Sequence, residues 1–267
     1  MTDFLPNEAK KHQKIVQKIR SVFEKYSYKK IKTPTIEYLD SLAVGLGETL
    51  QSEAIKVFDP AGHVLVLRPD HTTPIARIAA TRLRDEPLPL RLYYLDPIFR
   101  NRPGSHEDDI ELFQAGIELI GDVSPKATAE VLIVCIDSIQ KLGYRDFKID
   151  IGHTDFAKGL SSEKKKALLE GNYLSGIPKR GGVELVKGHT DLVEVYNLLK
   201  KAKCEKFIEF NLGLVKDLNY YTGMIMECYV QGFRRSIGSG GQYNNLLGKF
   251  GMDCPAVGFA LNVNALL

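Results

Sequence analysis

The segment from Phe99 to Gly116, FRNRPGSHEDDIELFQAG, changes its chemical character within a few residues. It begins with Arg100 and Arg102, and a planar guanidinium group can bind two phosphate oxygens at once. Carboxylates then follow closely, at Glu107, Asp108, Asp109 and Glu111. Because carboxylates repel the phosphate groups that arginines attract, the segment begins like a triphosphate site and continues as a stretch that a triphosphate would avoid.

Other residue types with metal or cofactor chemistry do not form a known pattern. The six histidines are His12, His63, His71, His106, His153 and His189. No two of them are spaced i, i+4 or grouped with cysteines, so the sequence predicts no metal site. The glycine-rich stretch GSGG, residues 238–241, lacks the G-x-G-x-x-G spacing, and no Walker sequence occurs. No cofactor is therefore predicted.

Helices must position these side chains, and three are indicated by apolar spacing and end signals. Apolar residues recur at helical spacing from Asn7 to Tyr26 and from Thr72 to Arg84. A third helix is predicted from Pro125 to Leu142, because Ser124 is a good N-cap and Gly143 suits a helix end. Residues from about 155 to 205 are charged and helical in pattern, which predicts a helical insertion.

Strands are predicted where β-forming residues alternate with turn residues. They are expected in VFDPAGHVLVLRP (57–69), RLYYLDPIFR (91–100), ELFQAGIELIG (111–121), FKIDIGH (147–153), EKFIEFNLGLV (205–215), YYTGMIMECYVQG (220–232) and PAVGFALNVNALL (255–267). Pro34 confines its own segment to an edge strand or a dimer contact, and GSGG is expected to be a turn. Without a βαβ alternation, the pattern predicts a single α+β domain over residues 1–267, built on an antiparallel sheet.

Composition and charge exclude several classes of protein. Lys and Arg (36) exceed Asp and Glu (33) by only three, which does not indicate a nucleic-acid surface. Cys135, Cys204, Cys228 and Cys254 are widely spaced, which predicts buried free thiols in a reducing compartment. The first residues, MTDFLPNEAKKHQK, lack the apolar core of a signal peptide, and no apolar run approaches the ~20 residues that a membrane span needs. A cytoplasmic protein without a membrane partner is therefore expected.

The order of the motifs resembles class II aminoacyl-tRNA synthetases, and within them histidyl-tRNA synthetases. The second class II motif has a similar order: Phe-Arg at a strand end, a loop, and then a strand with Phe-Gln and Gly-x-Glu. In that motif the arginine, here Arg100, pairs with the α-phosphate of ATP. The other matching pieces are TPTIE (33–37), LRPDHTTPIARIA (67–79), LVKDLNYYTG (214–223) and GSGGQYNNLLGKFG (238–251) with PAVGFALNVNALL. The resemblance spans essentially the whole chain and implies a class II synthetase-like antiparallel sheet flanked by helices, in a homodimer.

The chain departs from this family where the family carries arginines around ATP. These positions hold Asp108, Ile110, Lys216, Gln242 and Ala265. Only Arg100 remains, as a residual phosphate-site residue. Each missing charge-assisted bond costs a few kcal/mol, so together the substitutions are expected to lower adenylation by many orders of magnitude. The nucleotide half of the site is interpreted as dismantled.

The amino-acid half of the site matches the family more closely. By resemblance the histidine-binding residues are Asp70, Thr72, Gln114, Glu118, Lys216, Tyr220 and Tyr221. A carboxylate for the ammonium group and phenol hydroxyls for ring nitrogens are what free histidine needs. Each residue also has a structural interpretation: the tyrosines as a packed strand pair, Gln114 as a partner of backbone groups, and Glu118 as an exposed strand carboxylate.

A synthetase-like domain with an amino-acid pocket, a stripped nucleotide pocket and no anticodon-binding domain is similar to the regulatory subunits of ATP phosphoribosyltransferase, paralogues of histidyl-tRNA synthetase. The resemblance implies no catalytic residue and no tRNA partner. It implies a short catalytic subunit as partner, activation of that subunit, and feedback inhibition by free histidine in histidine biosynthesis. The alternatives are a divergent or truncated histidyl-tRNA synthetase catalytic domain, a relative that activates an amino acid for another acceptor, and a synthetase-like RNA-binding regulator.

Overall fold

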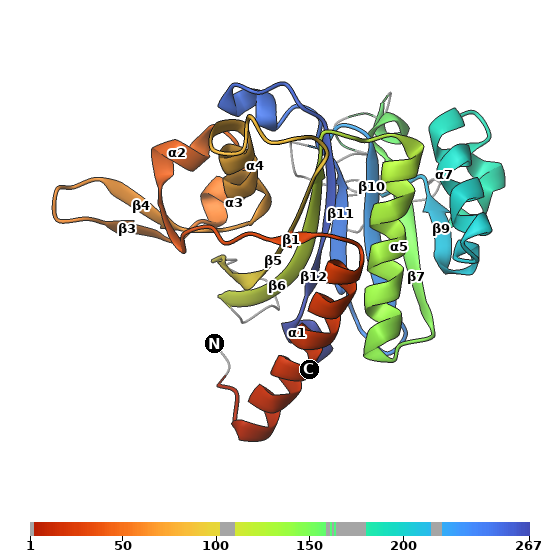
Figure 1. The fold of residues 1–267 in the computed structure, drawn as a ribbon, viewed down its shortest axis with the longest axis horizontal. Coiled ribbons are helices and arrows are strands. Elements are labelled where there is room, and N and C mark those ends of the chain that lie inside the picture. The colour runs from red at the N-terminus through yellow and green to blue at the C-terminus, as the bar shows by residue number, and fades with distance from the viewer. Residues whose placement is uncertain (1–2, 102–109, 159–160, 162, 164–179, 215–220) are drawn as a thin grey trace.

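The computed structural model describes residues 3–101, 110–158, 161, 163, 180–214 and 221–267, and its centre is a nine-stranded sheet (Figure 1). The strand order is β1-β5-β6-β12-β11-β10-β7-β9-β8. These strands are β1 (Lys29–Lys30), β5 (Leu90–Phe99), β6 (Glu111–Ile120), β7 (Phe147–His153), β8 (Arg180–Gly181), β9 (Ile208–Asn211), β10 (Met224–Val230), β11 (Gly238–Gln242) and β12 (Ala256–Asn262). The two long strands β5 and β6 flank residues 100–110, the stretch in which arginines are followed by carboxylates.

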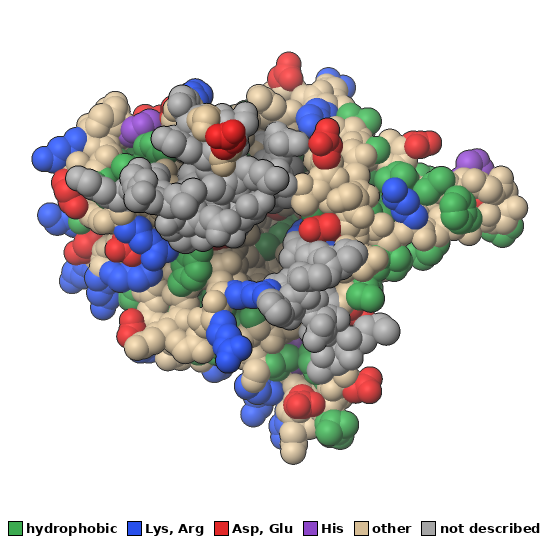
Figure 2. Space-filling view, turned by 180° about the vertical axis from the view of Figure 1, so that it is seen from behind, with side chains coloured by type: hydrophobic (Ala, Val, Ile, Leu, Met, Phe, Trp, Pro, Cys, Tyr) green, Lys and Arg blue, Asp and Glu red, His purple; other side chains and the backbone are tan. Residues whose placement is uncertain are grey.

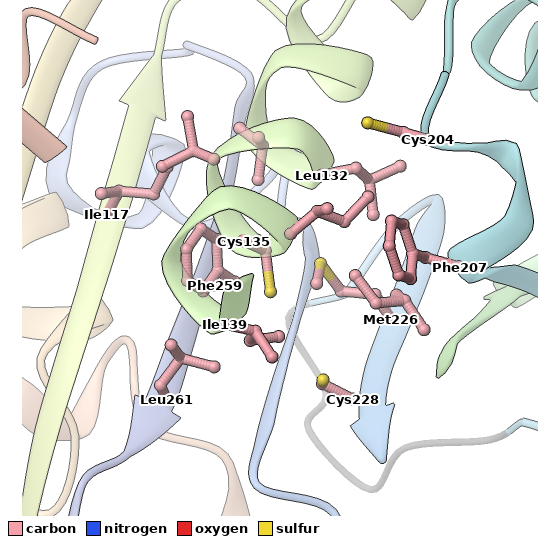
Figure 3. Packing of buried hydrophobic residues seen from close by; sticks show 14 of the residues in the cluster. Ile117, Leu132, Cys135, Ile139, Cys204, Phe207, Met226, Cys228, Phe259 and Leu261 are labelled. Carbon is pink, nitrogen blue, oxygen red and sulfur yellow. The ribbon is translucent and has the colours of Figure 1, made fainter. Parts of the chain in front are cut away.

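Three helices cover one face of this sheet, and Figure 1 shows α5 lying along it between the other two. They are α1 (Pro6–Lys25), α5 (Pro125–Leu142) and α7 (Thr190–Lys201). Helix α5 has the predicted ends: the Ser124 Oγ accepts a hydrogen bond from the Ala127 N–H at 3.3 Å, and Gly143 ends the helix with φ 109°. Its apolar side packs on the sheet around Cys135 and Ile139 (Figure 3).

Part of the opposite face is covered by a smaller unit with its own core. A three-stranded sheet contains β2 (Ile36–Tyr38), β3 (Lys56–Phe58) and β4 (Val64–Leu67). The helices α2 (Leu39–Ala43), α3 (Glu48–Glu53) and α4 (Thr72–Thr81) lie beside it. Buried Leu42, Val66 and Ile75 pack there against Leu92 and Tyr94 of β5, so this unit is fixed to the main sheet. No helix in the described part of the chain is long and apolar enough to span a membrane.

Two strand pairs correct the prediction of an antiparallel sheet. The pairs β1 with β5 and β7 with β9 are parallel, while the pairs between them are antiparallel. A parallel pair needs a crossover connection, and α7 supplies it between β7 and β9 by packing on α5. Leu192, Val195 and Leu199 of α7 belong to the main apolar cluster. Helix α7 lies within the predicted insertion at 155–205, whose residues 159–160, 162 and 164–179 are outside the described residues.

The glycine-rich stretch GSGG is strand β11, and the prediction of a turn was wrong. It pairs on one side with β10 and on the other with β12. A Cβ atom at Gly240 would lie 2.2 Å from the Gly258 carbonyl oxygen, so glycine is needed here because two backbones approach closely. The prediction of free cysteines is confirmed: Cys135, Cys204, Cys228 and Cys254 are buried and form no disulfide.

Candidate functional site

A polar cavity opens on the face of the main sheet that α1, α5 and α7 leave uncovered, the side from which Figure 2 is viewed. Its volume is about 80 Å³, whereas one water needs roughly 10–15 Å³, so a small molecule fits. Its lining is Asp70, His71, Thr72, Tyr94, Arg100, Gln114, Glu118, Tyr221, Ser239, Gly240, Gly241, Tyr243, Gly258, Phe259 and Ala260. The cavity therefore brings together residues from every matching motif except TPTIE.

The two-residue period of the strands places the polar side chains in this cavity. On β6, Gln114 and Glu118 point to the same face, with Gly116 between them. Tyr94 lies opposite Gly116, where an added Cβ would be 2.4 Å from the tyrosine ring. Gly258 lies opposite Glu118, where a Cβ would be 2.0 Å from the glutamate Oε2. Both glycines provide the space into which a neighbouring side chain fits.

Glu118 is a buried carboxyl group in the lining of the cavity, with 2% of its surface exposed. The Thr72 hydroxyl donates a hydrogen bond to its Oε1 at 2.9 Å, and the Tyr243 hydroxyl donates to its Oε2. Burial raises the pKa of Glu118 from its ordinary value to about 8, although both hydrogen bonds oppose this shift. Without a ligand, this group therefore holds a proton at neutral pH.

Asp70 supplies a second buried carboxyl group. The Thr73 hydroxyl donates to its Oδ2 at 3.0 Å, whereas its Oδ1 has no hydrogen-bond partner among the described residues. Burial raises the pKa of Asp70, and the charge of Arg100 acts in the opposite direction. Arg100 also donates from Nε to the Pro69 carbonyl oxygen at 2.6 Å. An unpaired oxygen in a buried polar cavity is a position where a ligand donor is stabilising.

His71 and Tyr94 form one wall of the cavity. Their rings stack at a centroid distance of 4.2 Å, and the Nε2 atom of His71 lies 3.0 Å from the Asp96 carbonyl oxygen. Burial lowers the pKa of His71 to about 3, so its ring is neutral and donates to that carbonyl. We infer that the ring positions Tyr94 and does not bind a ligand as a cation.

Six of the predicted site residues line this one cavity: Asp70, Thr72, Arg100, Gln114, Glu118 and Tyr221. Lys216 and Tyr220 lie outside the described residues, as do Arg102 and Asp108. Since no ligand is present, histidine binding by these residues stays a prediction. Sequence reasoning missed Tyr94 and Tyr243. Tyr243 lies inside the matched GGxYxxLL piece, whereas Tyr94 could be found only from its pairing with Gly116.

Gln242, at one of the positions where the resembling family carries arginine, has three hydrogen bonds within the protein. Its Oε1 accepts from the Met224 N–H at 3.0 Å, and its Nε2 donates to the Thr128 hydroxyl at 3.0 Å and to the Val123 carbonyl oxygen at 3.2 Å. The side chain therefore connects β10, β11 and the start of α5. An amide so bound is not available to a phosphate group.

Comparison with known proteins finds one matching family model and several similar curated proteins. The profile described as "Histidyl-tRNA synthetase" matches residues 1–174 and 179–266. The ATP phosphoribosyltransferase regulatory subunit of Thermoanaerobacter pseudethanolicus is 36% identical over 98% of this chain and 79% of that protein. The protein of the same name from Geobacter metallireducens is 33% identical over 100% of this chain and 72% of that protein.

Solved structures are similar over the whole chain. The structure titled an ATP phosphoribosyltransferase regulatory subunit/histidyl-tRNA synthetase from Bacillus halodurans matches with TM-score 0.89 and 28% identity, covering 100% of this chain and 80% of that one. Apo histidyl-tRNA synthetase of S. aureus matches with TM-score 0.75 at 24% identity, covering 100% of this chain and 67% of that one, which shows the shared fold. The predicted class II synthetase-like α+β fold is thereby confirmed, and the chain belongs to the family of ATP phosphoribosyltransferase regulatory subunits.

Proposed function

We propose that this chain is a non-catalytic regulatory subunit of ATP phosphoribosyltransferase that binds free histidine in the cavity around Glu118. In this proposal it acts in the cytoplasm with a short catalytic subunit, which it activates, and the bound amino acid mediates feedback inhibition. The names of the relatives support the role as a regulatory subunit of ATP phosphoribosyltransferase. The observation that carries the choice of ligand is the pair of buried carboxyl groups, Asp70 and Glu118, in one small cavity.

The donors of histidine complement this pair. The ammonium group of histidine only donates hydrogen bonds, and the Oδ1 atom of Asp70 is an acceptor to which no described residue donates. Its imidazole can bond Glu118, and Tyr221 lines the same cavity. Arg100 also lines the cavity, and its positive charge complements the ligand carboxylate. The ammonium cation of the ligand, held in the same small cavity as both carboxyl groups, favours their ionised forms, so binding is expected to release the proton that burial retains on Glu118.

The chain is not expected to adenylate histidine. Gln242 is bound within the protein where the family has an arginine, and Ala265, in the last short helix, has no polar group for a phosphate. Pure protein should show no histidine-dependent exchange between pyrophosphate and ATP, with an active histidyl-tRNA synthetase as the positive control. Exchange above the level of a histidine-free sample would contradict the proposed loss of catalysis.

Calorimetric titration separates the main alternatives. The full chain would be titrated with histidine and, separately, with ATP and magnesium. Binding of histidine without binding of ATP supports the regulatory role and justifies assays with a short phosphoribosyltransferase. Tight binding of ATP would favour the second candidate, a divergent or truncated synthetase catalytic domain. Two observations favour this second candidate: Arg100 lines the cavity, and the histidyl-tRNA synthetase profile matches the chain.

We also propose that the chain forms a homodimer through the small three-stranded sheet. Large apolar side chains are exposed there: Ile36 (50%), Tyr38 (53%), Val44 (54%) and Phe58 (73%). They lie on or beside the projecting β3–β4 hairpin, where Figure 2 shows apolar side chains at the surface. Exposed apolar patches of this kind favour association.

Sedimentation at micromolar concentration should give twice the chain mass, and Phe58→Asp should shift the protein toward the monomer. A monomeric unmodified chain would contradict this proposal.

A further inference from the structure

His153, Asp155 and His189 form a cluster outside the candidate site. His153 ends β7, Asp155 lies in the short helix Thr154–Ala157, and His189 immediately precedes α7. One possible ligand atom from each lies within 4.8 Å of the others, and this is the only such group of three among the described residues. The fold creates the cluster because the end of β7 meets the start of the crossover helix.

The distances within this cluster suit a small metal ion. The Nδ1 atom of His153 and the Oδ2 atom of Asp155 are 3.5 Å apart. Two ligands bound at about 2.0–2.2 Å to a tetrahedral zinc ion are separated by roughly 3.4 Å. The centroids of the His153 and His189 rings are 5.1 Å apart. Because the candidate ligand atoms lie within 4.8 Å of one another, closing the third onto the same ion requires a movement of up to roughly 1.4 Å, which a side-chain rotation supplies.

The hydrogen bonds around the cluster show which nitrogen of His153 carries a lone pair. The backbone N–H of Asp155 donates to the Nδ1 atom of His153 at 3.1 Å, so this nitrogen is unprotonated and faces Asp155. A metal ion would take the place of that backbone donor. Lys158 pairs with the other carboxylate oxygen, Oδ1, at 2.5 Å, and its side chain is 77% exposed. It can thus remain on Oδ1 or move into solvent when Oδ2 binds a cation.

Aromatic contacts hold the two rings near each other. The ring of Phe156 packs edge-on against the His189 ring at a centroid distance of 5.0 Å, and its centroid lies 5.9 Å from that of His153. The side chain of His153 is 19% exposed and that of Asp155 is 38% exposed, so an ion can enter from solvent. An ordinary surface ion pair explains the contact of His153 with Asp155, but it does not explain a second imidazole packed beside them.

We propose that His153, Asp155 and His189 bind a divalent transition-metal ion, with water completing the coordination. Two imidazoles and one carboxylate suit Zn²⁺, whereas Mg²⁺ and Ca²⁺ prefer a set of oxygen ligands. The site connects three parts of the chain. The Thr154 N–H also donates to the Gly223 carbonyl oxygen at 3.0 Å, so the ion would fasten α7 to the segment that carries Tyr221.

The test is titration of the chelator-treated full chain with Zn²⁺ by calorimetry, with the visible absorption of Co²⁺ as a second readout. Loss of one ligand in His189→Ala is expected to weaken Zn²⁺ binding at least tenfold and to remove the tetrahedral Co²⁺ spectrum. The matched control is His63→Ala. His63 also pairs with an aspartate, Asp59 at 2.8 Å, but belongs to no group of three. Its removal should leave Zn²⁺ binding unchanged.

Three outcomes would overturn the proposal. They are an absence of Zn²⁺ binding by the unmodified chain, equal affinity in His189→Ala, and loss of binding in His63→Ala. Circular dichroism checks that His189→Ala folds, and His189→Gln, which keeps the size and polarity of the side chain, replaces it if it does not. Zn²⁺ should also raise the melting temperature of the unmodified chain and not that of the His189 variant, because an ion that binds only the folded state stabilises it.

Discussion

Replacing Glu118 by alanine is expected to weaken histidine binding by roughly 30- to 1,000-fold, or about 2–4 kcal/mol. The change removes the carboxyl group that faces the ligand and leaves the hydroxyl groups of Thr72 and Tyr243 without their acceptor. Calorimetry of the pure chain measures the affinity. In the complex with a short catalytic subunit, the same variant should require a correspondingly higher histidine concentration for inhibition, and Tyr221→Ala should act in the same direction.

A matched control comes from the same strand. Glu111 begins β6 and is exposed, so Glu111→Ala should bind histidine as the unmodified chain does. Unchanged affinity in both Glu118→Ala and Tyr221→Ala would place the effector elsewhere, for example at the interface between subunits. Weakening by Glu111→Ala to the same degree would show that the effect comes from β6 as a whole and not from the carboxyl group in the cavity.

The second large effect concerns stability and pH. Since the pKa of Glu118 is about 8 in the folded chain, against an ordinary value of 4.5, the folded state holds a proton that the unfolded state releases. The stabilisation is complete below about pH 4.5 and is lost as the pH rises through about 8. The loss over the whole range is at most roughly 5 kcal/mol. The free energy of unfolding without ligand should therefore fall across this range.

Urea unfolding at about pH 5.5 and about pH 8 would measure this loss, with Glu118→Gln as the comparison. Glutamine resembles the protonated carboxyl group and does not titrate, so the variant should lose less stability between the two conditions. The difference between the two proteins isolates Glu118 from other titrating groups, including Asp70, whose pKa is also raised by burial. Equal losses in the two proteins would mean that Glu118 is already ionised in the folded chain.

Local signals predicted much of this fold. Ser124, Pro125 and Gly143 define the ends of α5 through side-chain and backbone properties that do not depend on the rest of the chain. The alternation along β6 likewise requires that Gln114 and Glu118 share one face. The grouping of motifs from distant segments into one site came from resemblance to a family, since no pattern within a single segment shows which strands become neighbours.

The features that were missed depend on contacts between segments far apart in the sequence. The stretch GSGG has the composition of a turn, and only its neighbours β10 and β12 make it a strand. The parallel pairing of β7 with β9 depends on the crossover through α7. His153 and His189 have no regular spacing, because the end of a strand and the start of a distant helix bring them together. Their proximity is a property of the topology.

Gln242 has a consequence for how this chain could change over time. Its amide bonds the Met224 N–H, the Thr128 hydroxyl and the Val123 carbonyl oxygen, and a Cβ at Gly223 would lie 2.0 Å from its Oε1. An arginine at this position has no acceptor atom, so it would leave the Met224 N–H without a partner. Gln242→Arg alone is therefore expected to cost stability, because Met224, Thr128 and Val123 hold atoms placed for an amide. An arginine at this position is expected to be tolerated only together with changes in these neighbouring residues.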